Sequence, residues 1–236
     1  MRFSPTRGVR PDGVFRDAAK DAVAGRHQMA LEKLVWFHEN AIRMQASLSG
    51  VRRSYALRAW KELGDKYPPA LKALRRSRNA ARNGARTKTG KAAGHCYADF
   101  AAVNHYLSEE PQTVRLFKWL HKHRPKVARD VYQRTEEVLA RAKEFKLCGA
   151  YIDSSEQFAR LRMQFRLNMR LARKEFGAEH EEYAHKSFSE KTTRLIALLA
   201  LNGRTKEANQ VVARAKRVWS DERFSQQLEA AQQGRF

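Results

Sequence analysis

The stretch Trp60-Lys61-Glu62-Leu63-Gly64-Asp65-Lys66-Tyr67, followed by Pro68-Pro69, decides the fold. Its large apolar residues stand at positions 60, 63 and 67, the spacing at which side chains line one face of a helix. A residue that precedes a proline is driven out of the α region, so this helix is expected to end at Tyr67. Proline fits the first turn of a helix, so the next helix is expected over about 69–82.

The same period recurs along the chain and predicts an all-α fold. Leu31, Leu34, Val35, His38 and Ile42 form one such stripe. Only 12 glycines and 6 prolines occur in 236 residues, too few turn residues for a sandwich or barrel of short strands. We expect roughly ten helices joined by short turns. After position 82 they are expected over about 95–107, 111–123, 125–145, 154–176, 179–201 and 205–219, with a last one capped by Ser220.

Length and composition predict one large helical domain behind a basic arm. Residues 1–16 carry four arginines, two prolines and two glycines, which indicates a flexible arm. Residues 17–233 are expected to form a single domain, because 42% apolar residues suffice for a core at this length. Residues 83–94 (NGARTKTGKAAG) hold three glycines and no large apolar residue, which predicts a basic loop or hinge.

Two patterns point to a repeat. Trp60-x-x-Leu63-Gly64-x-x-Tyr67 fits the opening half of the tetratricopeptide repeat, in which the small residue permits close helix packing. Gly25-Arg26-x-x-x-Ala30 recurs as Gly203-Arg204-x-x-x-Ala208. An ordinary core stripe of Trp, Leu and Tyr explains the first pattern as well. We expect a tetratricopeptide-like α-solenoid of antiparallel helix pairs.

Several segments together resemble a family of bacterial tetratricopeptide-like helical-repeat proteins. The resemblance covers roughly residues 25–175, and it implies a fold without implying an activity. Its specific parts are Trp36-Phe37-His38-Glu39-Asn40-Ala41, Gly50-Val51-Arg52, Trp60-Lys61-Glu62-Leu63-Gly64, Tyr67-Pro68-Pro69-Ala70-Leu71 and Ala101-Ala102-Val103-Asn104-His105-Tyr106-Leu107.

Cysteine use and hydropathy predict a cytoplasmic protein without a membrane partner. Cys96 and Cys148 are 52 residues apart, so neither a disulfide framework nor a four-cysteine zinc site is available. The longest apolar run, 195–201, is too short for a bilayer that needs about 20 residues. No apolar segment follows the basic N-terminus, so a secretory signal is not expected.

The sequence contains only near-misses to catalytic motifs. The segment 84–92 resembles a phosphate-binding loop, but it has one residue too many between its glycines and Ala92 in place of the metal-binding hydroxyl. His180 and His185 are spaced by five residues, which places them on different faces of a helix. His95 and Cys96 are adjacent and do not face each other on a helix. We therefore expect no catalytic, cofactor or metal site, and no enzyme.

Charge is the most informative feature. Lys and Arg number 47 against 25 Asp and Glu, a net charge of +22. Between Asp65 and Asp99 no acid occurs, and between Glu156 and Glu175 none occurs either. The candidate binding residues come from these two segments: Arg75, Arg76, Arg78, Arg82, Arg86, Lys88 and Lys91 from the first, and Arg162, Arg166, Arg170 and Arg173 from the second.

Three interpretations of these basic clusters stay open at this point. The rows are solvated surface, or they bind an acidic protein, or they bind nucleic acid without sequence specificity. Stacked helix pairs leave a groove that holds extended peptides or partner helices. The leading hypothesis is therefore a non-enzymatic interaction module that binds a protein or peptide through its groove or basic face. Binding of RNA or DNA through the arginine-rich faces is the alternative.

Overall fold

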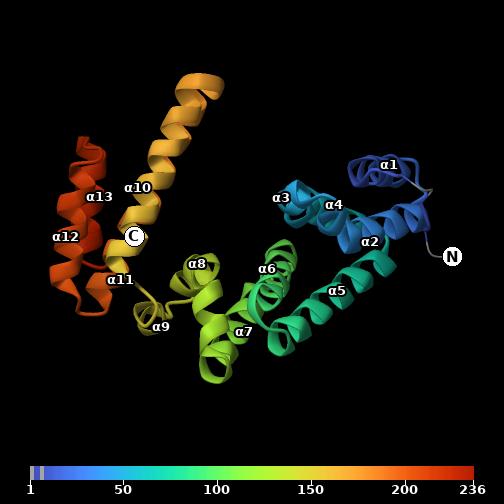
Figure 1. The fold of residues 1–236 in the computed structure, drawn as a ribbon, viewed down its shortest axis with the longest axis horizontal. Helices are drawn as coiled ribbons and strands as arrows, with labels where there is room; N and C mark the ends of the chain where they lie inside the picture. Colours follow the sequence, from blue (N-terminus) through green and yellow to red (C-terminus); the bar gives the residue numbers. More distant parts are fainter. Residues whose placement is uncertain (1–2, 6–7) are drawn as a thin grey trace. The chain divides into compact units, whose positions relative to one another are not determined.

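The computed structural model describes residues 3–5 and 8–236, and within them the chain is helical with no strand (Figure 1). The expected all-α class is confirmed. In chain order, the first elements are α1 (Pro11–Val23), α2 (His27–Met44), the 3-10 turn η1 (Ala46–Leu48), α3 (Ser49–Arg53), α4 (Tyr55–Lys66), α5 (Pro68–Thr87), α6 (Gly90–Tyr106), α7 (Glu110–His123) and α8 (Pro125–Arg141). It is followed by α9 (Phe145–Gly149), α10 (Ser154–Leu171), the π-helical turn η2 (Ala172–Phe176), α11 (Gly177–Leu201), α12 (Thr205–Lys216) and α13 (Glu222–Gln232).

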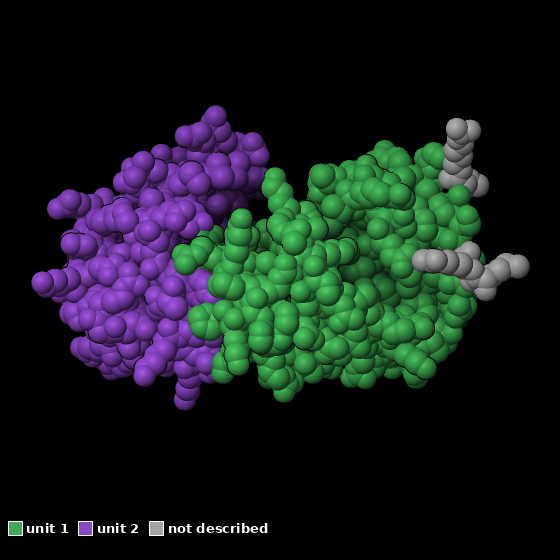
Figure 2. All heavy atoms as spheres, turned by 60° about the horizontal axis from the view of Figure 1, so that its bottom comes forward, with its two compact units in different colours: residues 1–138 green, residues 139–236 purple. Residues whose placement is uncertain are grey.

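The chain divides into two compact units, 1–138 and 139–236, coloured separately in Figure 2. This differs from the single domain expected over 17–233. The division falls inside α8, a helix without a break, so no glycine, proline or polar linker marks it in the sequence. Composition therefore had no signal for it.

The N-terminal arm expected over 1–16 is shorter in the structure. Residues 1–2 and 6–7 lie outside the described residues. Helix α1 begins at Pro11, where proline occupies the first helical position. Val14 is buried, and the ring of Phe15 stacks on that of Phe37 in α2 with 5.2 Å between centroids. The buried Val14 and the half-buried Phe15 hold 11–16 in the fold in spite of their basic neighbours.

The loop expected over 83–94 is wrong. Helix α5 continues to Thr87 and α6 begins at Gly90, so only Lys88 and Thr89 separate them. Gly84 is buried, and a Cβ added there would lie 2.5 Å from Cys96 Sγ in α6. This glycine permits close contact between two helices, and it does not form a turn. The sequence pattern is the same in both cases, which is why the prediction failed.

The Trp60 segment packs as its spacing predicted. Trp60 is 2% exposed, and its Nε1 donates a hydrogen bond to the carbonyl of Ala70 at 3.0 Å. Gly64 is buried, and a Cβ there would lie 3.2 Å from the Cβ and backbone nitrogen of Leu71. Helices α4 and α5 therefore meet closely on either side of the turn at Tyr67. The proline boundaries at Pro68, Pro111 and Pro125 are also confirmed to within one residue.

In the second unit the long helix α11 is central and contacts α9, α10, α12 and α13. Phe158 and Phe165 of α10 are buried, and the rings of Phe165 and Phe188 lie 4.8 Å apart. Asp153 caps α10 by accepting a hydrogen bond from the backbone N–H of Glu156 at 2.9 Å. An aromatic cluster between α10 and α11 is thus one part of the core of this unit.

Candidate binding groove

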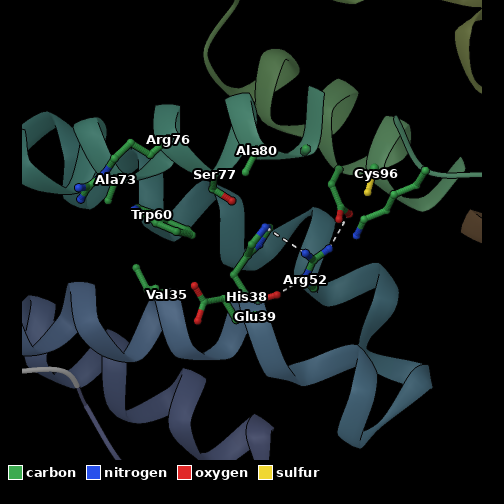
Figure 3. Close-up of a pocket in the computed structure, with 13 residues that line it drawn as sticks. Val35, His38, Glu39, Arg52, Trp60, Ala73, Arg76, Ser77, Ala80 and Cys96 are labelled. Carbon is green, nitrogen blue, oxygen red and sulfur yellow. Dashed lines mark hydrogen bonds and ion pairs between the residues drawn. The ribbon is translucent and has the colours of Figure 1, made fainter. Parts of the chain in front are cut away.

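A hollow of about 580 Å³ lies in the first unit between α2 and α5 (Figure 3). Val35 and His38 of α2 line one side, and Ala73, Ser77 and Ala80 of α5 line the other. In Figure 3, His38 and Ser77 project from their two helices toward the space between them. Further lining comes from Trp60, Arg52, Cys96 and Asp99.

A second hollow of about 350 Å³ adjoins the first. The two share Val35, Ala73 and Arg76 in their walls. The second continues past Trp36 to Phe3, whose ring contacts the Trp36 ring edge-on at 6.1 Å. The two hollows therefore lie next to each other along α2 and α5, and together we call them the α2–α5 groove.

Small side chains on one face of α5 create the groove. Ser77 stands four residues after Ala73, and Ala80 and Ala81 stand three and four residues after Ser77, so all four line the same side of the helix. Because none of them reaches far from the backbone, space is left opposite α2. Sequence reasoning missed these positions, since it followed the arginines of the same helix. A row of small residues at helical spacing is the signal that could have found them.

A buried polar network closes one end of the groove. Arg52 Nη1 and Arg53 Nε both donate to Asp99 Oδ1, at 2.5 and 2.7 Å. Arg52 also donates to the backbone carbonyl of His38, and its Nη2 lies 3.1 Å from His38 Nε2. Burial alone raises the pKa of the Asp99 carboxyl, but the two guanidinium groups outweigh it and hold that pKa below its usual value. The network ties α2, α3 and α6 together.

His38 is neutral, and its one ring N–H is buried in the wall of the groove. Its side chain is only 6% exposed, and burial together with the Arg52 charge lowers its pKa to about 3. A guanidinium can only donate, so Nε2 accepts from Arg52 and the ring proton is on Nδ1. Among residues 3–5 and 8–236, Nδ1 has no hydrogen-bond partner. A buried donor left in this way costs about 1–3 kcal/mol, which a ligand with an acceptor would relieve.

The predicted basic residues of 75–91 do not form one cluster. Arg75 and Arg78 both form ion pairs with Glu109, and the Arg86 guanidinium lies 4.2 Å from the centre of the Trp119 ring. Two others, Arg76 and Lys88, line the α2–α5 groove and form no ion pair with any residue that the structure describes. Arg82 and Lys91 are exposed.

The second predicted set lies in the other unit. Arg162, Arg166 and Arg170 are exposed on α10, and Arg173 is exposed in η2. They are thus on different elements from the groove residues and belong to the other compact unit.

The near-miss motifs gain no support as chemical centres. Cys96 and Cys148 are free thiols, and Cys148 is buried. Over 3–5 and 8–236, no group of three or more His, Cys, Asp or Glu side chains is placed to hold a metal ion. In the same residues no helix has the length and apolar character needed to cross a bilayer.

No family model, no curated protein and no solved structure matches this chain. The resemblance to tetratricopeptide-like proteins therefore stays a prediction, and it depends on the Trp36 and Trp60 segments. The ligand of the groove is therefore inferred from the residues that line it.

Proposed function

We propose that this protein is a non-enzymatic, tetratricopeptide-like interaction module that binds an extended acidic peptide in the α2–α5 groove. Short links join its successive helices, and α4 and α5 pack closely through Gly64 in the way that helix-pair repeats require. The groove runs along two helices, as it does in modules that hold extended chains.

The buried Nδ1–H of His38 is the single observation that carries this proposal. His38 lines the groove, and its Nδ1, which is shielded from solvent in the free chain, lacks an acceptor among the described residues. A backbone carbonyl of a bound peptide supplies that acceptor, at no cost in charge, once the ring shifts to expose Nδ1. Its other ring nitrogen is occupied by Arg52, and its pKa of about 3 leaves it no capacity to take up a proton near neutral pH. His38 is therefore suited to hold a ligand and unsuited to act as a general base.

Charge and shape give the peptide its character. Arg76 and Lys88 stand in the groove wall beside Glu39 and Glu32, and neither cation forms an ion pair with a described residue, so acidic side chains of the ligand pair with them. The half-buried Val35 and Trp36 offer apolar surface between these charges. The preferred ligand is thus an acidic segment that carries at least one large apolar residue.

Nucleic acid is the competing ligand class, and the pairing of the α5 arginines weighs against it. Arg75 and Arg78 form ion pairs with Glu109, and the Arg86 guanidinium contacts the Trp119 ring. Fewer cations are therefore available to phosphates than the sequence alone predicts. Duplex binding through six contacts would weaken by about 10³-fold between 50 and 200 mM salt. A peptide held by one donor, two cations and apolar contacts has a much shallower salt dependence.

The test is a peptide selected from a random displayed library against the full chain, then measured by fluorescence anisotropy. Ala80→Trp fills the groove from an exposed position, and Arg76→Glu reverses a wall charge. Each is expected to weaken binding at least tenfold. The matched controls Ala19→Trp and Arg58→Glu alter exposed residues of the same unit outside the groove, and they are expected to bind like the parent chain.

Two results would overturn the proposal. One is a selected peptide whose affinity is the same in the groove variants and in the parent chain. The other is a library that yields no binder, while generic DNA or RNA shifts in a gel with the steep salt dependence of phosphate contacts.

A further inference from the structure

Helix α10 of the second unit carries two apolar rows on opposite faces. The first row, which includes Phe158 and Phe165, is buried against α11. The second consists of Met163 and Leu167, which are 65% and 47% exposed. Each of these two stands two residues from Phe165, and so about 160° around the helix from it. One face of α10 therefore belongs to the core, and the other is an apolar row open to solvent.

An arginine precedes each member of the outer row. Arg162 and Arg166 stand directly before Met163 and Leu167, and Arg170 before the half-buried Leu171. The arginine–apolar doublet thus repeats every four residues over three turns of helix. None of these three arginines forms an ion pair within the described chain, and no acid occurs between Glu156 and Glu175. We call this surface the α10 outer face.

We propose that the α10 outer face docks an amphipathic helix whose apolar row is flanked by acidic residues. Two helices that pack along their apolar rows use the flanking charges to choose their partner. On α10 those flanking charges are arginines, so the partner requires Asp or Glu at the matching positions. Methionine adapts to differently shaped neighbours, and it is common on surfaces that receive partner helices.

The row and its charges disfavour three other occupants. A second copy of this chain would bring two unpaired arginine rows together, which repel each other. Nucleic acid would satisfy the arginines but leave Met163 and Leu167 against phosphates and water, because stacking on bases uses aromatic side chains. A lipid surface calls for a broad apolar face, whereas this row is one residue wide, with Arg160 and Gln164 on its other flank.

The experiment uses the full chain and a designed helical peptide of about 20 residues, with Leu every fourth position and Glu beside each Leu. Fluorescence anisotropy is expected to give a micromolar Kd. Met163→Ser together with Leu167→Ser is expected to weaken binding at least tenfold, and Arg166→Glu is expected to do the same. Val23→Ser and Arg217→Glu are the matched controls, because Val23 is exposed in α1 and Arg217 is exposed in the turn after α12.

A scrambled peptide of the same charge separates docking from general attraction to a protein of +22. The proposal requires it to bind at least tenfold more weakly than the amphipathic peptide. Equal binding of the two peptides overturns the proposal, as does equal affinity of the outer-face variants and their controls. It is also overturned if the outer-face variants reduce binding to vesicles with anionic headgroups, or to single-stranded RNA, and leave peptide binding unchanged.

Discussion

Acid is expected to destabilise the first unit through His38. The native ring stays neutral down to a pKa of about 3, whereas an unfolded histidine titrates near 6.5. When the native pKa is lower than the unfolded one, the unfolded state binds the extra proton as the pH falls. The stabilisation is therefore complete above pH 6.5 and is lost progressively between pH 6.5 and pH 3.

The magnitude follows from these two values. Between pH 7 and pH 5 the unfolded ring gains most of one proton and the native ring gains almost none. At about 1.4 kcal/mol per proton and pH unit below 6.5, the free energy of unfolding falls by about 2 kcal/mol over this interval. Continuing to pH 4 removes a further amount of about 1.4 kcal/mol from the same source.

Urea unfolding at pH 7 and pH 5, followed by tryptophan fluorescence and circular dichroism, measures the effect. The matched variant is His38→Gln, which keeps an acceptor for Arg52 and does not titrate. The parent chain is expected to lose about 2 kcal/mol more than the variant between the two pH values, with unchanged dependence on urea. Equal losses in the two proteins would refute a buried, neutral His38.

Three further changes test the packing that frames the sites, each by its urea midpoint. Gly84→Ala is expected to destabilise the chain by about 2 kcal/mol, because the new Cβ meets Cys96 Sγ at 2.5 Å; a neutral result would restore the loop interpretation of 83–94. Asp99→Asn removes the negative charge that pairs with Arg52 and Arg53, and it is expected to lower the free energy of unfolding by about 3 kcal/mol. An unchanged free energy of unfolding would mean that this network does not stabilise the fold. Asp221→Ala removes the acceptor for the Phe224 N–H at the start of α13, for about 1 kcal/mol; no change would show that this cap is dispensable.

The helices could be predicted from the sequence because their signals are local. The three- and four-residue spacing around Trp60 reports the buried face directly, and a proline before a helix fixes its start whatever the rest of the chain does. The buried Trp60 and the glycine beside Leu71 are therefore where the pattern placed them.

Neither the groove nor the ion pairs of the arginines could be predicted, because both depend on contacts between residues that are distant in the sequence. Glu109 lies 31 residues beyond Arg78, and Asp99 lies 47 beyond Arg52, so no window on the sequence joins them. Gly84 illustrates the same limit, since a glycine required by a crossing helix looks identical to a glycine required by a turn.

The most direct measurement of the central claim is the nitrogen-15 and proton spectrum of the His38 imidazole, recorded with and without the library-selected acidic peptide. Free protein is expected to show a neutral ring with its proton on Nδ1. With peptide bound, the Nδ1–H resonance is expected to move downfield as it gains an acceptor, while Nε2 keeps its contact with Arg52. A saturating peptide that leaves the His38 resonances unchanged would contradict the account.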